Sequence, residues 1–253
     1  MPEQLEFHAL TFVDEPEGVM VGRVGADSYF LFPADGAALL RQLADGMTPA
    51  KAERWYASCF GETVDITDFL ATLDELGLIA TGDAPSAPTP VGFQRLGRAI
   101  FSPVALACYL AVVAGAVVEL VLLPALLPRP GDVFFTSSLI VTQLVLAALQ
   151  VPLVGWHELF HVLAGRRLGV PSRLGITRRW FFVVFETELN GLLGVPRRSR
   201  YLPFLAGMMA DAVLFGVLTL ILTTLVDPAS LAGRVLLAVR VVLVMRLIWQ
   251  FFV

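Results

Sequence analysis

The sequence has few charged residues, few histidines and few cysteines. Only 16% of its 253 residues are charged, against about 25% in an average soluble domain. Of its two cysteines, Cys59 lies in the polar front part and Cys108 lies in an apolar run. This placement predicts no internal disulfide and gives no indication of an oxidising compartment.

The amino terminus lacks the basic start and short apolar core of a secretory signal peptide. We therefore expect the first part of the chain to stay in the cytosol. Hydrophobic residues make up 57% of the chain and the mean hydropathy is +0.75, which is typical of an integral membrane protein. No internal repeat of 20 to 50 residues is evident.

Charge divides the chain into two parts. Residues 1–94 contain 15 acidic and four basic side chains, a balance of about −11, whereas the remainder has a balance of about +7. The segment TGDAPSAPTP, where the two compositions meet, is typical of a linker. We predict a cytosolic domain over residues 1–80, a linker over residues 81–94 and a membrane domain over residues 95–253.

Four apolar segments after the linker are long enough to cross a membrane, which takes about 20 helical residues. Their approximate ranges are 99–127, 135–165, 201–226 and 231–253. The loop between the second and third segments carries eight arginines, and such basic loops stay on the cytosolic side. The sequence thus predicts a membrane α-helical bundle of about four spans with both ends inside the cell.

The motif HELFH lies within the second of these spans. His157 and His161 are four residues apart, so a helix presents both imidazoles on one face, with Glu158 beside them. Zinc suits such a pair, and Glu158 is then the candidate general base for metal-assisted amide hydrolysis. The alternative is a hydrogen-bonded histidine pair in a helix bundle, but ionisable groups inside a membrane favour a functional site.

Asp211, in the segment LAGMMAD, is the candidate third metal ligand. His161 and His157 lie about 7.5 and 13.5 Å along the helix from Arg166, and Asp211 lies about 16 Å from Arg200, so the depths are compatible. An ion pair between Asp211 and Arg240 of the fourth span is the competing interpretation.

HELFH in an apolar span, followed by a basic loop and LAGMMAD, resembles the site-2-type intramembrane zinc metalloproteases, in particular a bacterial branch of peptide zinc metalloproteases. The resemblance covers about residues 150–253 and implies zinc as cofactor in a bacterial cell membrane. In that family an Asp-Gly or similar motif in a later span supplies the third ligand, and this chain shows no such motif. Either Asp211 substitutes, or the ligand lies beyond Val253, or the site is degenerate.

The cytosolic domain reads as a small α+β fold with a winged-helix outline. Residues 19–32 are typical of a hairpin, and helices are expected over residues 36–43, after Thr48 and from Asp65 to near Gly77. A winged helix often binds nucleic acid, but a balance near −11 excludes phosphate-neutralising contacts. A peptide is the better partner.

FLFPADGAALLRQLADGMT followed by DITDFLATLDELGLI resembles the PqqD-like domains that recognise ribosomally made precursor peptides. That resemblance implies that a leader peptide adds as a strand to the sheet edge and packs against the third helix. The groove residues it implies are Tyr29, Leu31, Phe69 and Leu73.

Three functions follow from these patterns. The first is a zinc metalloendopeptidase that cuts a peptide precursor held by the cytosolic domain. The second is a non-catalytic membrane adaptor or immunity protein that passes the peptide to a transporter or modifying enzyme. The third keeps the chemistry but cuts a membrane-bound transcription regulator.

Overall fold

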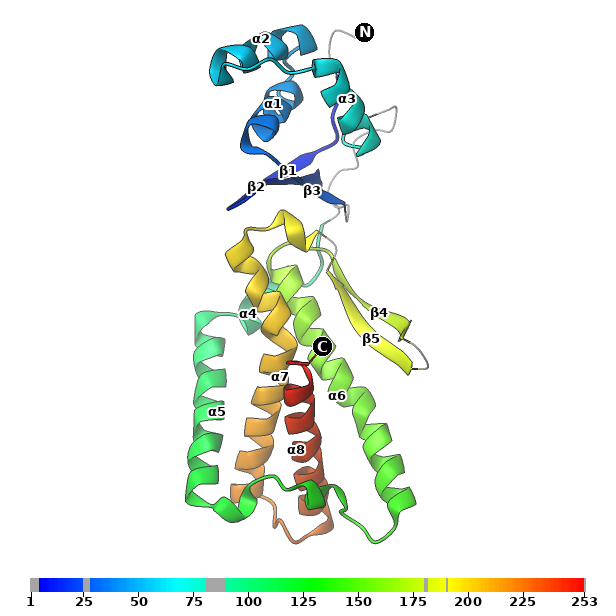
Figure 1. The fold of residues 1–253 in the computed structure, drawn as a ribbon. Helices are drawn as coiled ribbons and strands as arrows, with labels where there is room; N and C mark the ends of the chain where they lie inside the picture. The colour runs from blue at the N-terminus through cyan, green and yellow to red at the C-terminus, as the bar shows by residue number, and fades with distance from the viewer. Residues whose placement is uncertain (1–4, 25–27, 81–89, 180–181, 190, 253) are drawn as a thin grey trace. The chain divides into compact units, whose positions relative to one another are not determined.

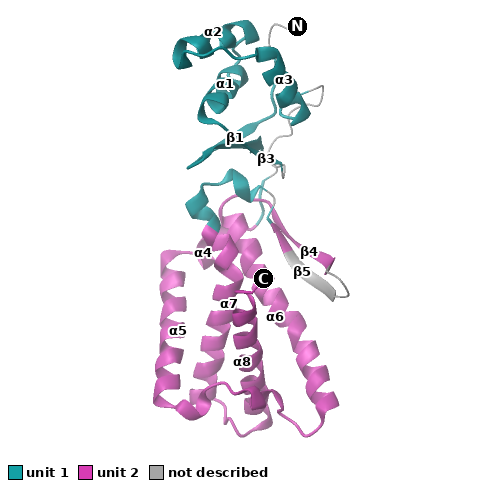
Figure 2. Cartoon of the chain, in the orientation of Figure 1, with its two compact units in different colours: residues 1–92, 189–200 teal, residues 93–188, 201–253 magenta. Residues whose placement is uncertain are grey.

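The computed structural model describes residues 5–24, 28–80, 90–179, 182–189 and 191–252. The chain divides into two compact units, which are coloured separately in Figure 2. The first contains residues 1–92 and 189–200, and the second contains residues 93–188 and 201–253. Residues 81–89, which form most of the predicted linker, lie outside the described residues.

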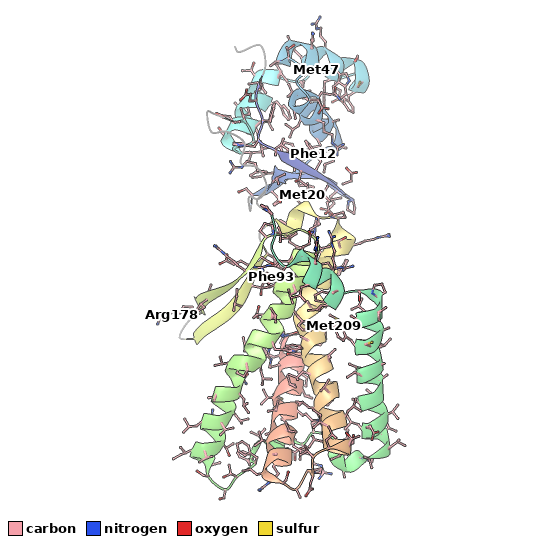
Figure 3. All side chains as sticks on the ribbon, turned by 180° about the vertical axis from the view of Figure 1, so that it is seen from behind. Phe12, Met20, Met47, Phe93, Arg178 and Met209 are labelled. Atoms are coloured by element: carbon pink, nitrogen blue, oxygen red, sulfur yellow. The ribbon has the colours of Figure 1, made fainter. Side chains whose placement is uncertain are left out.

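A three-stranded antiparallel sheet with the order β1-β2-β3 forms one layer of the first unit (Figure 1). The strands are β1 (Leu10–Glu15), β2 (Gly18–Arg23) and β3 (Tyr29–Phe32). Phe12 of β1 pairs with Val21, and Met20 of β2 pairs with Leu31; Phe12 and Met20 are labelled in Figure 3. The predicted hairpin corresponds to β2 and β3, and β1 is an additional strand.

Three helices cover one face of this sheet: α1 (Ala34–Ala44), α2 (Pro49–Phe60) and α3 (Ile66–Glu75). All three were expected from the sequence. Asp65 caps α3 by accepting hydrogen bonds from the backbone N–H groups of Thr67 and Asp68. Thr48 precedes α2 but makes no side-chain capping bond. Apolar residues from the sheet and the helices pack into one core, which includes Val21, Phe32, Leu39, Leu40, Leu43, Leu70 and Leu73.

A segment from much later in the sequence completes the first unit. Its short helix η3 (Leu192–Gly194) packs against β1 and β2. The ring of Tyr29 lies so close to Gly194 that a Cβ there would be 2.6 Å from the Tyr29 hydroxyl. Arg200 forms a largely buried ion pair with Glu15, at 2.6 Å between Nη2 and Oε1. Sequence reasoning assigned residues 189–200 to a loop of the membrane domain and did not anticipate this docking.

The second unit is mainly helical (Figure 1). Its helices are α4 (Gln94–Ile100), α5 (Pro103–Leu122), α6 (Leu139–Arg167), α7 (Arg197–Thr224, which begins in the first unit) and α8 (Leu231–Trp249). Two 3₁₀ turns, η1 (Pro124–Leu126) and η2 (Pro130–Val133), lie between α5 and α6. Phe93, which Figure 3 labels, directly precedes α4. The guanidinium of Arg166, near the end of α6, lies 5.5 Å from the centroid of its ring.

Among the described residues, three helices are long and apolar enough to cross a membrane: α5, α6 and α7. They correspond to the first three predicted spans, and α6, with 29 residues, has the excess length expected from the sequence. The fourth predicted span forms α8. This helix carries three arginines and is not among the helices that are long and apolar enough to cross a membrane. The chain therefore combines a helical membrane part with a small α/β domain.

The arginine-rich loop after α6 contains a β-hairpin that the sequence analysis did not predict. Its strands are β4 (Ser172–Arg179) and β5 (Phe182–Leu189). An exposed cross-strand ion pair joins Arg173 Nε to Glu188 Oε2 at 2.6 Å. This hairpin lies next to the predicted catalytic motif, because Thr187 of β5 contacts Glu158 of α6.

Candidate metal and catalytic site

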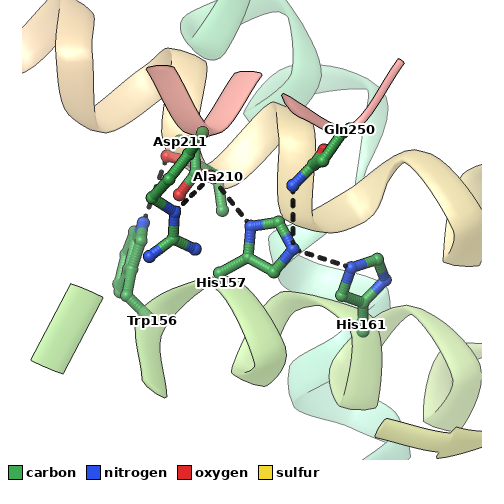
Figure 4. A network of polar contacts seen from close by, with 7 residues as sticks. Trp156, His157, His161, Ala210, Asp211 and Gln250 are labelled. Atoms are coloured by element: carbon green, nitrogen blue, oxygen red, sulfur yellow. Dashed lines mark hydrogen bonds and ion pairs between the residues drawn. The ribbon is translucent and has the colours of Figure 1, made fainter. Parts of the chain in front are cut away.

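Helix α6 brings the two histidines of HELFH together, as the sequence predicts. The Nε2 atoms of His157 and His161 are 3.2 Å apart, and the ring centroids are 4.9 Å apart (Figure 4). Two imidazole nitrogens that bind one tetrahedral zinc ion at 2.0–2.1 Å lie about 3.3 Å apart. The separation of the two Nε2 atoms therefore suits a single ion between them.

The other nitrogen of each ring has a hydrogen-bond acceptor. His161 Nδ1 lies 2.6 Å from the carbonyl oxygen of Pro203, and His157 Nδ1 lies 2.9 Å from Asp211 Oδ2. A carbonyl oxygen can only accept, and the carboxylate accepts when ionised, so both Nδ1 atoms carry the proton in the neutral rings. Each Nε2 then carries a lone pair in place of a proton, and the two Nε2 atoms are neighbours. Such a pair of acceptors suits a cation.

Small residues on α7 allow this close approach to α6. A Cβ at Gly207 would collide with the Nε2 atoms of both His157 and His161. Ala206 and Ala210, on either side of Gly207, are completely buried, and Trp156 Nε1 donates to the Ala210 carbonyl at 3.2 Å. The segment LAGMMAD thus serves as the small-residue contact by which membrane helices pack closely.

Asp211 is completely buried and orients His157 in the present arrangement. Its Oδ2 contacts His157 Nδ1 and also lies 3.3 Å from Arg246 Nε, and its Oδ1 has no hydrogen-bond partner among the described residues. The carboxylate therefore lies on the side of the ring away from the paired Nε2 atoms, as in carboxylate–histidine–metal arrangements.

The ion pair suggested between Asp211 and Arg240 is not the one that forms. Arg246, one and a half turns further along α8, takes that place. Arg240 is completely buried and donates to the carbonyl oxygen of Leu126 at 2.8 Å, with its guanidinium 4.9 Å from the ring centroid of Phe215. The sequence could not distinguish the two arginines, because both lie on α8 without a charged partner on that helix.

Glu158 has a partner that the sequence analysis missed. Thr187 Oγ1 donates to Glu158 Oε2 at 2.8 Å and lies 3.1 Å from the Glu158 carbonyl oxygen. No pattern in the sequence links positions 158 and 187, because the contact depends on a hairpin that was not predicted. Glu158 itself is half-buried and adjoins the histidine pair along α6.

Gln250 adjoins the histidine pair. Gln250 Nε2 lies 3.3 Å from His157 Nε2, so its amide can donate to that lone pair. Gln250 also lines a cavity of about 460 Å³ together with Gln150, Arg246 and apolar side chains, but neither histidine is part of that lining. Neither Gln250 nor Arg246 was among the predicted site residues.

The spacing of the histidine pair would suit two ligands of one zinc ion, but among the described residues a third protein ligand is not assembled beside it. Among the described residues, no group of three or more His, Cys, Asp or Glu side chains is placed to hold a metal. Asp211 and Glu158 are both close to the pair, but each is engaged elsewhere, with the Nδ1 side of His157 and with Thr187. The ligand role predicted for Asp211 therefore stays a prediction.

The four residues predicted for a peptide groove lie in different surroundings. Tyr29 and Leu31 alternate along β3 with Phe30 and Phe32, which pack on the core, so they lie on the other face of the sheet. Leu31 is 46% exposed, whereas Leu73 is completely buried and serves the core. Phe69 is half-buried at the edge of that core. The structure does not bring all four together on one surface.

Comparison of the chain with protein-family models, with curated proteins and with solved structures found no match.

Proposed function

We propose that the chain is a membrane-embedded zinc metalloendopeptidase that cuts a ribosomally made peptide precursor. The observation that carries this proposal is the pair of Nε2 atoms, 3.2 Å apart, whose rings are both oriented through Nδ1. The resemblance of HELFH to the site-2-type metalloproteases agrees with it. The bundle of four spans, with a cytosolic first unit in a bacterial cell membrane, is part of the same proposal.

The residues of the chain have separate roles in this chemistry. His157 and His161 would hold zinc. As a Lewis acid, the ion would polarise the scissile carbonyl and would lower the pKa of a water molecule bound to it. Glu158 accepts the proton of the attacking water and passes it to the leaving amine. Asp211 and the Pro203 carbonyl keep both imidazoles in the orientation and tautomer that a metal needs. Asp211 is also the candidate third ligand, but the two roles are alternatives, because its carboxylate lies on the Nδ1 side of His157.

The first unit would recognise the precursor by strand addition. β3 ends the sheet order β1-β2-β3, so its outer edge has no neighbouring strand among the described residues. The winged-helix outline and the PqqD-like resemblance favour a leader peptide at this edge, where main-chain bonds supply affinity. Phe69 of α3 and the exposed Leu31 supply apolar contacts, and Leu73 supports α3 from the core.

Glu158→Gln tests the proposal. We expect the purified variant to keep the zinc content of the wild type, measured by mass spectrometry, because the substitution leaves both histidines in place. Cleavage of internally quenched peptides with random apolar centres should fall by about 10²- to 10⁴-fold, since the general base is lost. Glu119→Gln on α5 is the matched control and should keep both properties. Undiminished cleavage by Glu158→Gln would remove the assigned base.

A second candidate function is a non-catalytic membrane adaptor or immunity protein. The missing third ligand among the described residues favours it. Such a protein would bind the peptide and pass it to a transporter or modifying enzyme without metal. Zinc near one equivalent per chain, lost in His157→Ala, supports the enzyme, and a metal-free wild type that still binds peptide supports the adaptor.

A further inference from the structure

The carboxylate of Glu158 is held by a residue of the hairpin and not by its own helix. Thr187 Oγ1 lies 2.8 Å from Oε2 and 3.1 Å from the Glu158 carbonyl oxygen. A hydroxyl has one proton to donate, and the charged carboxylate is the stronger of these two acceptors. This bond selects one rotamer of a flexible side chain and leaves the second carboxylate oxygen available for a proton.

We propose that Thr187 is a positioning residue for Glu158: its hydroxyl holds one carboxylate oxygen and leaves the other available to accept the proton of the attacking water. The inference rests on the proposed function and adds a residue to the same site.

Substitution of Thr187 separates positioning from a structural role. Thr187→Val keeps the size and β-branching of the side chain but removes the donor, whereas Thr187→Ser keeps the donor. With internally quenched peptides of random apolar centre as the probe, Thr187→Val should lower kcat by about 10- to 100-fold with KM changed less than about threefold. Thr187→Ser should recover most of the rate, and zinc content should stay the same in both variants. The matched control is Arg173→Ala, which removes an exposed ion pair from the same hairpin.

Hydrogen exchange of the full chain gives a readout that does not depend on turnover. Thr187→Val should speed exchange of the β5 amides by about tenfold, since it frees the strand from α6, and Thr187→Ser should not.

These two readouts distinguish failure of the inference from failure of the proposed function. Unchanged β5 exchange in Thr187→Val overturns the inference, whatever the activity of the wild type. An equal loss of rate in Thr187→Val and Thr187→Ser also overturns it. Changed exchange in a wild-type protein without zinc or peptide cleavage instead overturns the enzyme and leaves the contact intact.

Discussion

The two compact units bury different kinds of side chain. The core of the first unit is built from apolar residues such as Val21, Leu40 and Leu73, and the largely buried ion pair of Glu15 with Arg200 lies outside that apolar cluster. The second unit buries His157, Asp211 and Arg240 among the apolar residues of its helices. Burial of polar groups costs free energy unless they are paired, and the cost is greatest away from water. The apolar core of the first unit thus stabilises its fold, whereas the second unit buries the polar residues of the candidate site.

Among the substitutions that test this contrast, Gly207→Ala should have the largest effect on zinc binding and cleavage. A single methyl group would collide with both Nε2 atoms, so either the imidazoles must turn away or the close packing of α7 must open. We expect nearly complete loss of bound zinc and of peptide cleavage, measured on protein purified in detergent. Gly155→Ala on α6, where an added Cβ meets no atom within 4 Å, is the matched control and should keep both. Equal zinc content in the two variants would contradict the assignment of the site.

Leu73→Ala tests the other half of the comparison. Leu73 is completely buried in the apolar core, so its truncation leaves a cavity and should lower the stability of the first unit by about 2–5 kcal/mol. Hydrogen exchange of α3 measures the loss, and zinc content should not change. Phe69 is only half-buried, so Phe69→Ala should lower stability less than Leu73→Ala and should weaken peptide binding more. If Leu73→Ala kept full stability and weakened peptide binding more than Phe69→Ala, Leu73 would belong to the peptide groove.

Local patterns predicted the three helices of the first unit and the long apolar helices of the second, because these elements depend on short stretches of sequence. Asp65 caps α3 as expected, and the four-residue spacing of HELFH brings both imidazoles together on one helix. The long apolar runs likewise predicted α5, α6 and α7.

Contacts between distant positions were not predictable in this way. The partner of Asp211 is Arg246 and not Arg240, and the choice depends on the rotation of α8. The contact of Thr187 with Glu158 requires a hairpin in a basic loop, and the docking of Arg200 on Glu15 joins residues 185 positions apart. Hydropathy and charge counts report composition along the chain, and they do not record which faces of distant elements meet.

The smallest expected effect concerns pH and belongs to the first unit. The Tyr56 hydroxyl lies 2.5 Å from Asp35 Oδ2, a bond that lowers the pKa of Asp35 below its usual 3.8 and raises the pKa of Tyr56 to about 12. A lowered carboxyl pKa stabilises the fold above the unfolded value and loses that contribution as pH falls through the folded value. A raised phenol pKa stabilises the fold below its unfolded value of 10 and loses that contribution as pH rises towards 12.

Tyr56→Phe removes this bond while keeping the ring. The difference in unfolding free energy between wild type and variant should be constant from about pH 5 to pH 9 and should shrink outside both limits. Chemical denaturation followed by hydrogen exchange of α2 measures it across pH. Zinc retention at pH 7 should be the same in both proteins, because the histidine pair belongs to the second unit. A difference that stays constant down to pH 2 would show that Asp35 does not accept this bond in solution.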